Sequence, residues 1–169
     1  MTDRLTAKRR SALMARIKGK NTGPELAVRR LTHSLGYRFR LHRADLPGTP
    51  DLVFPSRRKV MFVHGCFWHG HGCSKGRLPK SKLDYWAPKI ANNRRRDARQ
   101  RRLLKAAGWS SLVIWACVIA DQRPLTELIT KFLGHTRYST KRPLRYAILS
   151  RQQRPSPADR NTRKRHAIR

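Results

Sequence analysis

The chain has 169 residues, and its 40 lysines and arginines against 9 acidic residues give a formal net charge of +31. Such a surface attracts polyanions, so we expect DNA or RNA as the partner, although a structural RNA-binding protein would carry the same charge. No stretch approaches the roughly 18 apolar residues of a membrane span, and the N-terminus lacks the apolar run of a signal peptide. We therefore expect a cytoplasmic protein without a disulfide framework.

Hydrophobic periodicity and turn residues predict alternating helices and strands along the chain. The predicted helices cover residues 7–17, 22–36, 82–107 and 124–133. The predicted strands cover residues 37–42, 51–54, 59–63 and 110–117. The second helix has the clearest start, since Thr22 and Glu25 have the spacing of a capping box and Pro24 lies in its first turn.

This order of elements predicts an α/β protein with a layered core. We expect a basic arm over residues 1–20, one domain over 21–135, and a basic, largely disordered tail over 136–169. The tail is expected to add nonspecific affinity for nucleic acid.

Residues 64–73 read HGCFWHGHGC and hold three of the seven histidines and two of the three cysteines. In a reducing compartment, cysteine beside histidine favours metal binding, and three thiolates with one imidazole suit a closed tetrahedral zinc site. The candidate ligands are Cys66, His71, Cys73 and Cys117. On spacing alone His64 or His69 could replace His71. The alternative is three free thiols, with Cys117 a small core residue.

Few acidic residues are available to hold a catalytic cation against a phosphodiester. Asp51 follows a proline at the start of a predicted strand, a pattern similar to the metal-binding hairpin of restriction-type nucleases, although an ordinary turn aspartate fits equally well. The capping box explains Glu25, which could also face the metal site. Asp97 could pair with Arg94 or Arg101 along its helix.

The remaining side chains of the 64–73 segment have two readings each. His64 and His69 could transfer protons near neutral pH, or could ligate zinc or support its ligands. Phe67 and Trp68 could stack on bases or wedge between them, but such a pair more often belongs to a core. Trp86 carries the same ambiguity.

Taken together, several motifs resemble the very short patch repair (Vsr) DNA mismatch endonucleases over roughly residues 7–135. The matching stretches are SALMARIKGKNTGPE, LPGTPDLVF, FVHGCFWHGHGC, the YW at 85–86, and GWSSLVIWAC. The resemblance implies a restriction-endonuclease-like, three-layer core with a central mixed sheet flanked by helices. It also implies Mg²⁺-assisted nicking of one DNA strand beside a T:G mismatch left by deamination of 5-methylcytosine.

The resemblance further implies a set of catalytic roles. Asp51 would hold Mg²⁺ with help from the backbone carbonyl of Val63, where family members have threonine. His69 would act as general acid or base, supported by Glu25, and His64 would lie near the scissile phosphate.

Zinc ligands and DNA contacts follow from the same resemblance. The implied structural zinc ligands are Cys66, His71, Cys73 and Cys117. The implied DNA-contacting residues are Met14, Phe67, Trp68, Trp86, Asn93 and Asp97. Of these, the three aromatic residues would enter from the major-groove side and Met14 from the minor-groove side. The basic tail has no counterpart in the family.

The expected partner is double-stranded DNA with a T:G mismatch, bound by a monomer. A functional link to a cytosine-5 DNA methyltransferase and to mismatch-repair proteins is also expected. Two alternatives stay open. A restriction-type endonuclease would cut both strands of matched duplex, and a non-catalytic zinc-stabilised nucleic-acid-binding protein would bind tightly and cut nothing.

Overall fold

A computed structural model of the chain describes residues 5–16 and 19–136, so the predicted disordered tail lies, from residue 137 on, outside the described residues. The helices are α1 (Ala7–Arg16), α2 (Gly23–Ser34), α3 (Leu83–Ala106) and α4 (Gln122–Leu133). The strands are β1 (Leu52–Phe54), β2 (Lys59–His64) and β3 (Ser110–Trp115). Within the described ranges, no helix combines the length and apolar character needed to cross a membrane.

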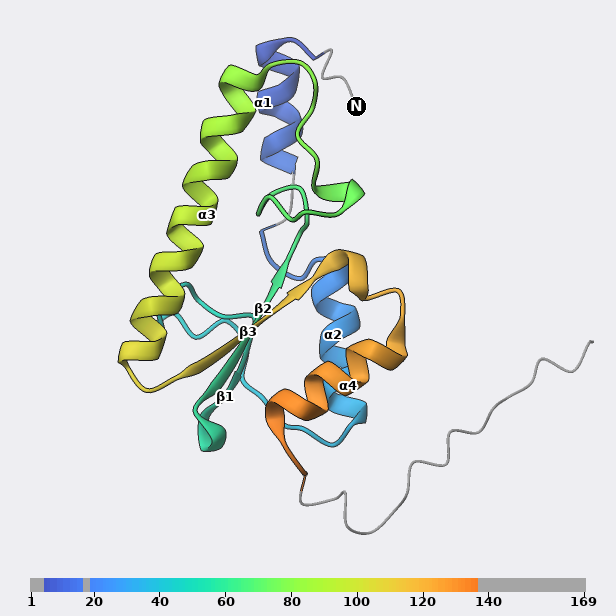
Figure 1. Ribbon diagram of the computed structural model, residues 1–169, viewed down its shortest axis with the longest axis vertical. Helices are drawn as coiled ribbons and strands as arrows, with labels where there is room; N and C mark the ends of the chain where they lie inside the picture. The colour runs from blue at the N-terminus through green and yellow to red at the C-terminus, as the bar shows by residue number, and fades with distance from the viewer. Residues whose placement is uncertain (1–4, 17–18, 137–169) are drawn as a thin grey trace, which may run out of the picture.

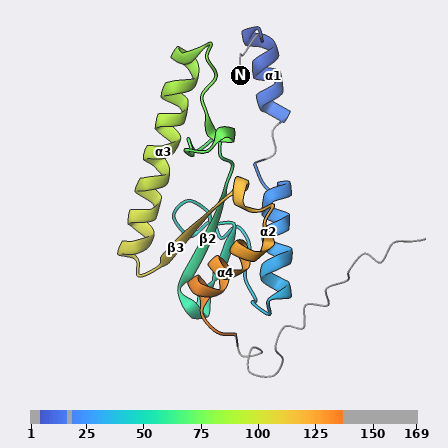
Figure 2. The same cartoon turned by 45° about the vertical axis from the view of Figure 1, so that its right-hand side comes forward.

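The three strands form a small mixed sheet with β2 at its centre. β1 pairs with β2 antiparallel, and β3 pairs with β2 parallel. A parallel neighbour requires a long crossover, which α3 supplies. Figure 1 shows α3 on one side of the sheet and α2 with α4 on the other, and the turned view of Figure 2 shows the same arrangement. The prediction of an α/β protein with a mixed sheet and flanking helices is confirmed.

Two apolar clusters fill the two faces of the sheet, because side chains alternate along each strand. Met61 and Ile114 belong to the cluster that packs with α2 and α4. Val60 belongs to the other cluster, which includes Leu104 of α3 and packs against the partly buried Val113. Helices therefore cover both faces of the sheet, although most of β3 is only partly buried.

The capping box of α2 forms as predicted. The backbone N–H of Glu25 donates to Thr22 Oγ1 at 3.4 Å, and the Glu25 carboxylate accepts from the backbone N–H of Asn21 at 2.9 Å. The first bond satisfies an amide that the first turn of a helix leaves without an intrahelical partner, and the second ties Asn21, the residue before the N-cap, to the helix.

The prediction of a strand over residues 37–42 is wrong. Only Arg40 pairs, in an isolated bridge with Val53. His42 has a φ of 46°, which ends the extended conformation soon after the bridge. The last predicted strand is also shorter than expected. It stops at Trp115, and Cys117 lies in the 3₁₀ turn Ala116–Val118.

Truncating the sheet core is predicted to destabilise the fold. Ile114 is 0% exposed and packs between β2 and the helices α2 and α4. Ile114→Ala should lower the free energy of unfolding by about 2–5 kcal/mol, measured by urea denaturation. Leu128→Ala, at an exposed position of α4, is the matched control and should cost much less. Equal losses for the two variants would contradict this packing.

Candidate active site and metal centre

The register of β2 against β3 brings distant cysteines together. Lys59 pairs with Ser110 and His64 with Trp115, and the same offset carried two residues further places Cys66 beside Cys117. Both strands end at this edge of the sheet. The loop that follows β2 and the turn that follows β3 can therefore share ligands.

One side-chain group has the composition of a zinc site. Its members are Cys66, His71, Cys73 and Cys117, and their donor atoms all lie within 4.8 Å of one another. The Cys117 Sγ and His71 Nδ1 atoms are 3.5 Å apart, and all three cysteines are free rather than disulfide-bonded. The group includes neither His64 nor His69. Three thiols and one imidazole are the donor set of structural zinc sites.

The loop that carries three of these ligands is tightly folded. The backbone N–H of His71 donates to the Cys66 carbonyl at 2.9 Å. A Cβ placed on Gly76 would lie 2.0 Å from the His71 carbonyl oxygen, whereas a Cβ on Gly72 would meet nothing within 4 Å. Gly70 has a φ of 60° and packs against Ile90 of α3. Glycine is therefore required at positions 70 and 76 of the loop.

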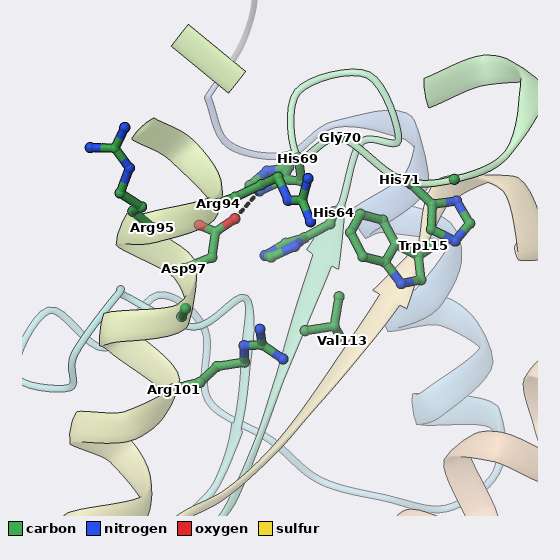
Figure 3. A pocket seen from close by; sticks show the side chains of 12 residues that line it. His64, His69, Gly70, His71, Arg94, Arg95, Asp97, Arg101, Val113 and Trp115 are labelled. Atoms are coloured by element: carbon green, nitrogen blue, oxygen red, sulfur yellow. Dashed lines mark hydrogen bonds and ion pairs between the residues drawn. The ribbon is translucent and has the colours of Figure 1, made fainter. Parts of the chain in front are cut away.

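A second group joins the same loop to α3. Its members are His64, His69 and Asp97. The His69 Nδ1 and Asp97 Oδ2 atoms are 2.5 Å apart, and the His64 and His69 rings stack with centroids 3.7 Å apart (Figure 3). The partner of Asp97 is thus His69, and neither Arg94 nor Arg101. A carboxylate on Nδ1 holds the proton there and leaves Nε2 as the reactive nitrogen.

His64 is largely enclosed by its neighbours. Its ring, on the last residue of β2, stacks on His69 and makes an edge contact with Trp115. Burial and the adjacent His69 lower the pKa of His64 to about 4. The ring is therefore neutral at physiological pH and can donate a hydrogen bond without carrying a charge.

Asp51 lies on the β1 side of β2, at the same end of the sheet as the group of cysteines and His71. It immediately precedes β1, and its Oδ2 accepts a hydrogen bond from the backbone N–H of Val63 at 2.7 Å. Burial raises the pKa of Asp51 to about 6, despite the hydrogen bond from Val63. A carboxylate that is costly to ionise in this way suits a divalent cation, whose charge offsets the burial.

Glu25 serves the first turn of α2 with both oxygens. Its carboxylate accepts hydrogen bonds from the Asn21 backbone, from Thr22 Oγ1 and from Arg29 Nη2, each at 2.9 Å. No contact with His69 is formed in the described structure, although both residues line one cleft. The capping role is therefore the one the geometry accounts for.

That cleft has a volume of about 480 Å³ and gathers residues from four parts of the chain. Its lining residues are Met14, Gly19, Thr22, Pro24, Glu25, Val63, Gly65, Trp68, His69 and Lys89. A second pocket, of about 500 Å³, lies on the α3 side of His64 and His69 and is rimmed by arginines of α3 (Figure 3). His69 lines both pockets, whereas His64 lines only the second.

Three aromatic residues pack on one another, and one of them, Trp68, lines the cleft. Phe67 makes edge-to-face contacts with Trp68 and Trp86, with ring centroids 5.1 and 5.0 Å apart. Trp86 is 5% exposed, whereas Phe67 and Trp68 are only partly buried. Asn93 donates from Nδ2 to the Trp68 carbonyl at 2.9 Å and so ties the loop to α3. Lys89 lies over the rings of Trp68 and Trp86.

Sequence reasoning missed two residues next to the acids. Arg29 and His42 connect Glu25 to Asp51 through side-chain contacts. The four-residue spacing of Glu25 and Arg29 on a helix was a visible signal for an ion pair. Nothing in the sequence marks the left-handed conformation that turns His42 toward them.

The chain matches known proteins over most of this region. A family model described as DNA mismatch endonuclease Vsr matches residues 2–75. The chain is similar to Type II nicking enzyme V.XorIIP of Xanthomonas oryzae, at 65% identity over 72% of this chain and 89% of that protein. It is also similar to DNA mismatch endonuclease Vsr of Escherichia coli, at 37% identity over 70% and 76%. Type II nicking enzyme V.NmeAIP of Neisseria meningitidis is 37% identical over 79% and 95%.

The glycine requirement of the loop predicts a contrast between two alanine variants. Gly76→Ala should push the Cys66–Cys73 segment apart, lowering both bound metal and stability, the latter by about 1–3 kcal/mol. Gly72→Ala should leave both unchanged, because its side chain enters open space. Metal content by plasma emission spectrometry and thermal melting measure the difference. Indistinguishable variants would contradict the loop geometry.

The buried carboxylate predicts a second stability change. At pH 8 without added Mg²⁺, Asp51→Asn should raise the free energy of unfolding by about 1–3 kcal/mol, since the amide still accepts from Val63 and has no charge to bury. The folded-state pKa of about 6 lies above the ordinary value of 3.8, so the wild-type deficit grows as pH rises through this window. Below about pH 4 the difference should vanish. A variant that is less stable than wild type at pH 8 would contradict it.

Proposed function

The chain belongs to the Vsr family of DNA endonucleases, and from that premise we propose that it nicks one strand of duplex DNA beside a T:G mismatch. Such mismatches arise when 5-methylcytosine is deaminated. The observation that carries the proposal is the shared cleft, in which Met14 and Trp68 meet His69 and Val63. Side chains able to probe a base stack thus lie beside side chains able to assist hydrolysis.

Asp51 and the backbone carbonyl of Val63 would hold Mg²⁺ in this proposal. The raised pKa of Asp51 and its position beside Val63 support the assignment. When bound, Mg²⁺ would stabilise negative charge on the phosphate and on the leaving oxygen. The hydrogen bond from Val63 fixes Oδ2, so the carboxylate is oriented before the phosphate arrives.

His69 is the proposed proton-transfer group. With Nδ1 held by Asp97, its Nε2 would accept a proton from the attacking water or return one to the leaving oxygen. His64, neutral because its pKa is about 4, would donate a hydrogen bond to the phosphate. Glu25 would support this centre by fixing the first turn of α2 at the wall of the cleft.

A zinc ion held by the group Cys66, His71, Cys73 and Cys117 would have a structural role, since all four tetrahedral positions come from the protein. It would lock the 65–73 loop onto the turn after β3. The restriction-endonuclease-like core is part of the same proposal, supported by the mixed sheet with helices on both faces.

DNA recognition would divide among the aromatic and helical residues. Phe67 and Trp68 would enter the base stack from the major-groove side, and Met14 from the minor-groove side. Trp86, buried at 5% exposure, and Asn93, bonded to the Trp68 carbonyl, would hold the loop that presents these rings. Asp97 would contribute through His69.

The proposed setting is a cytoplasmic monomer acting on DNA. A functional link to a cytosine-5 DNA methyltransferase follows from the origin of the T:G mismatch, and mismatch-repair proteins would act on the same lesion.

A nicking assay on two duplexes that differ only in a T:G or a C:G pair tests the proposal. Wild type with Mg²⁺ should nick only one strand of a T:G duplex and leave the matched C:G duplex intact, as measured by denaturing gel electrophoresis. Asp51→Asn should slow nicking by at least about 100-fold, because the cation loses its carboxylate. Asp45→Asn removes an exposed acid and should have no effect.

Three outcomes would contradict it. Undiminished nicking by Asp51→Asn would remove the carboxylate from the mechanism. Cleavage of both strands of the C:G duplex would favour a restriction-type enzyme. Tight, salt-sensitive binding without cleavage under any divalent metal would favour a non-catalytic nucleic-acid-binding protein.

A further inference from the structure

A series of side-chain contacts runs from Glu25, in the first turn of α2, through Arg29 and His42 to Asp51. We propose that Arg29 and His42 are positioning residues, which together orient the Asp51 carboxylate for its cation. The proposal rests on the proposed function, because it takes Asp51 as the carboxylate that holds Mg²⁺.

The contacts are continuous. Arg29 Nη2 lies 2.9 Å from Glu25 Oε2 and 2.8 Å from His42 Nε2, and Arg29 Nη1 donates to Asn21 Oδ1 at 2.6 Å. The other ring nitrogen of His42, Nδ1, lies 3.9 Å from Asp51 Oδ1. The side chains of Arg29 and His42 are 10% and 17% exposed, so water competes little for these groups.

The chemistry of arginine fixes the tautomer of the histidine. A guanidinium only donates hydrogen bonds, so His42 Nε2 must accept from Arg29. The ring proton is then on Nδ1, the nitrogen that faces Asp51.

Each oxygen of the Asp51 carboxylate therefore has its own neighbouring N–H group. The backbone N–H of Val63 holds Oδ2 at 2.7 Å, and the Nδ1–H of His42 faces Oδ1. At 3.9 Å the second contact is longer than a hydrogen bond, so the ring acts as an oriented dipole in this conformation. A small rotation of either side chain closes the bond, as happens when active-site groups tighten around a bound reactant.

The arrangement is costly for the fold, which argues for a functional role. Among the described residues, Arg29 Nε is buried without a hydrogen-bond partner. His42 has a φ of 46°, in a region that few residues other than glycine occupy, although asparagine, aspartate and histidine enter it more often than the rest. Such local costs concentrate at functional sites.

A purely structural reading assigns Arg29 to Glu25 alone, as a helical ion pair that stabilises the start of α2. It predicts that His42 matters only through its contact with Arg29. Two substitutions separate the readings. His42→Asn keeps a donor at the place of Nδ1, facing Asp51, and asparagine tolerates the left-handed backbone. His42→Gln keeps an acceptor near the place of Nε2, facing Arg29.

The experiment compares wild type, His42→Ala, His42→Asn and His42→Gln in nicking of a T:G duplex at saturating DNA. For each protein, the Mg²⁺ concentration at half-maximal rate and the maximal rate are measured, together with the thermal midpoint. His42→Ala should raise the half-saturating Mg²⁺ concentration about tenfold, the usual effect of removing a group that orients a metal ligand. His42→Asn should lie close to wild type and His42→Gln close to His42→Ala.

Arginine provides a matched control on the same helix. Arg29→Met should shift the Mg²⁺ response in the same direction as His42→Ala. Arg30→Met removes the same charge from an exposed position and should leave the response unchanged. Should His42→Ala melt below the assay temperature, the contrast between the asparagine and glutamine variants decides the question.

Two results would overturn the inference. One is a wild-type Mg²⁺ response in His42→Ala, and the other is rescue by glutamine but not by asparagine. Both are read against wild type that nicks and Asp51→Asn that does not. A wild-type protein without Mg²⁺-dependent nicking would instead refute the proposed function itself.

Discussion

The pairing of β2 with both of its neighbours is the constraint on which the site depends. The parallel register with β3 sets Cys66 beside Cys117, since each lies two residues past the paired positions His64 and Trp115. The antiparallel register with β1 brings Asp51 to the end of β2, where its carboxylate accepts a hydrogen bond from the backbone N–H of Val63. A shift of one residue would turn alternate side chains to the opposite face and separate both pairs. The apolar clusters on the two faces of the sheet fix this register.

The side chains of the loop after β2 form three separate sets of contacts. Cys66, His71 and Cys73 turn toward Cys117, and His69 turns toward Asp97 on α3. Between them, Phe67 and Trp68 pack on Trp86, and Trp68 lines the cleft. Backbone hydrogen bonds and close packing at glycine fix the backbone of this loop. Its side chains can therefore point toward three different groups of neighbours. A structural ion would thus position His69 and the aromatic residues at the same time.

The sequence predicted what depends on local patterns. The capping box located the start of α2. Cysteine and histidine spacing indicated a metal site, but spacing alone left His64 and His69 open in place of His71. The strand predicted over residues 37–42 failed, because alternation cannot reveal that His42 leaves the extended region. The contact of Asp97 with His69 and the links from Arg29 to Asp51 join residues that are distant in sequence. These contacts follow from tertiary packing, which local patterns in a single sequence do not predict. The need for glycine at position 76 likewise arises from a close approach to the His71 carbonyl.

The central claim is that two metals occupy separate positions on one sheet edge, with zinc on the loop and the catalytic cation at Asp51. The most direct test is anomalous X-ray scattering from crystals of the wild-type protein with a T:G duplex and with Mn²⁺ in place of Mg²⁺. The account predicts a zinc-edge peak among Cys66, His71, Cys73 and Cys117, and a manganese peak against Asp51 and the Val63 carbonyl. A manganese peak in the group of His64, His69 and Asp97, with none at Asp51, would contradict the account.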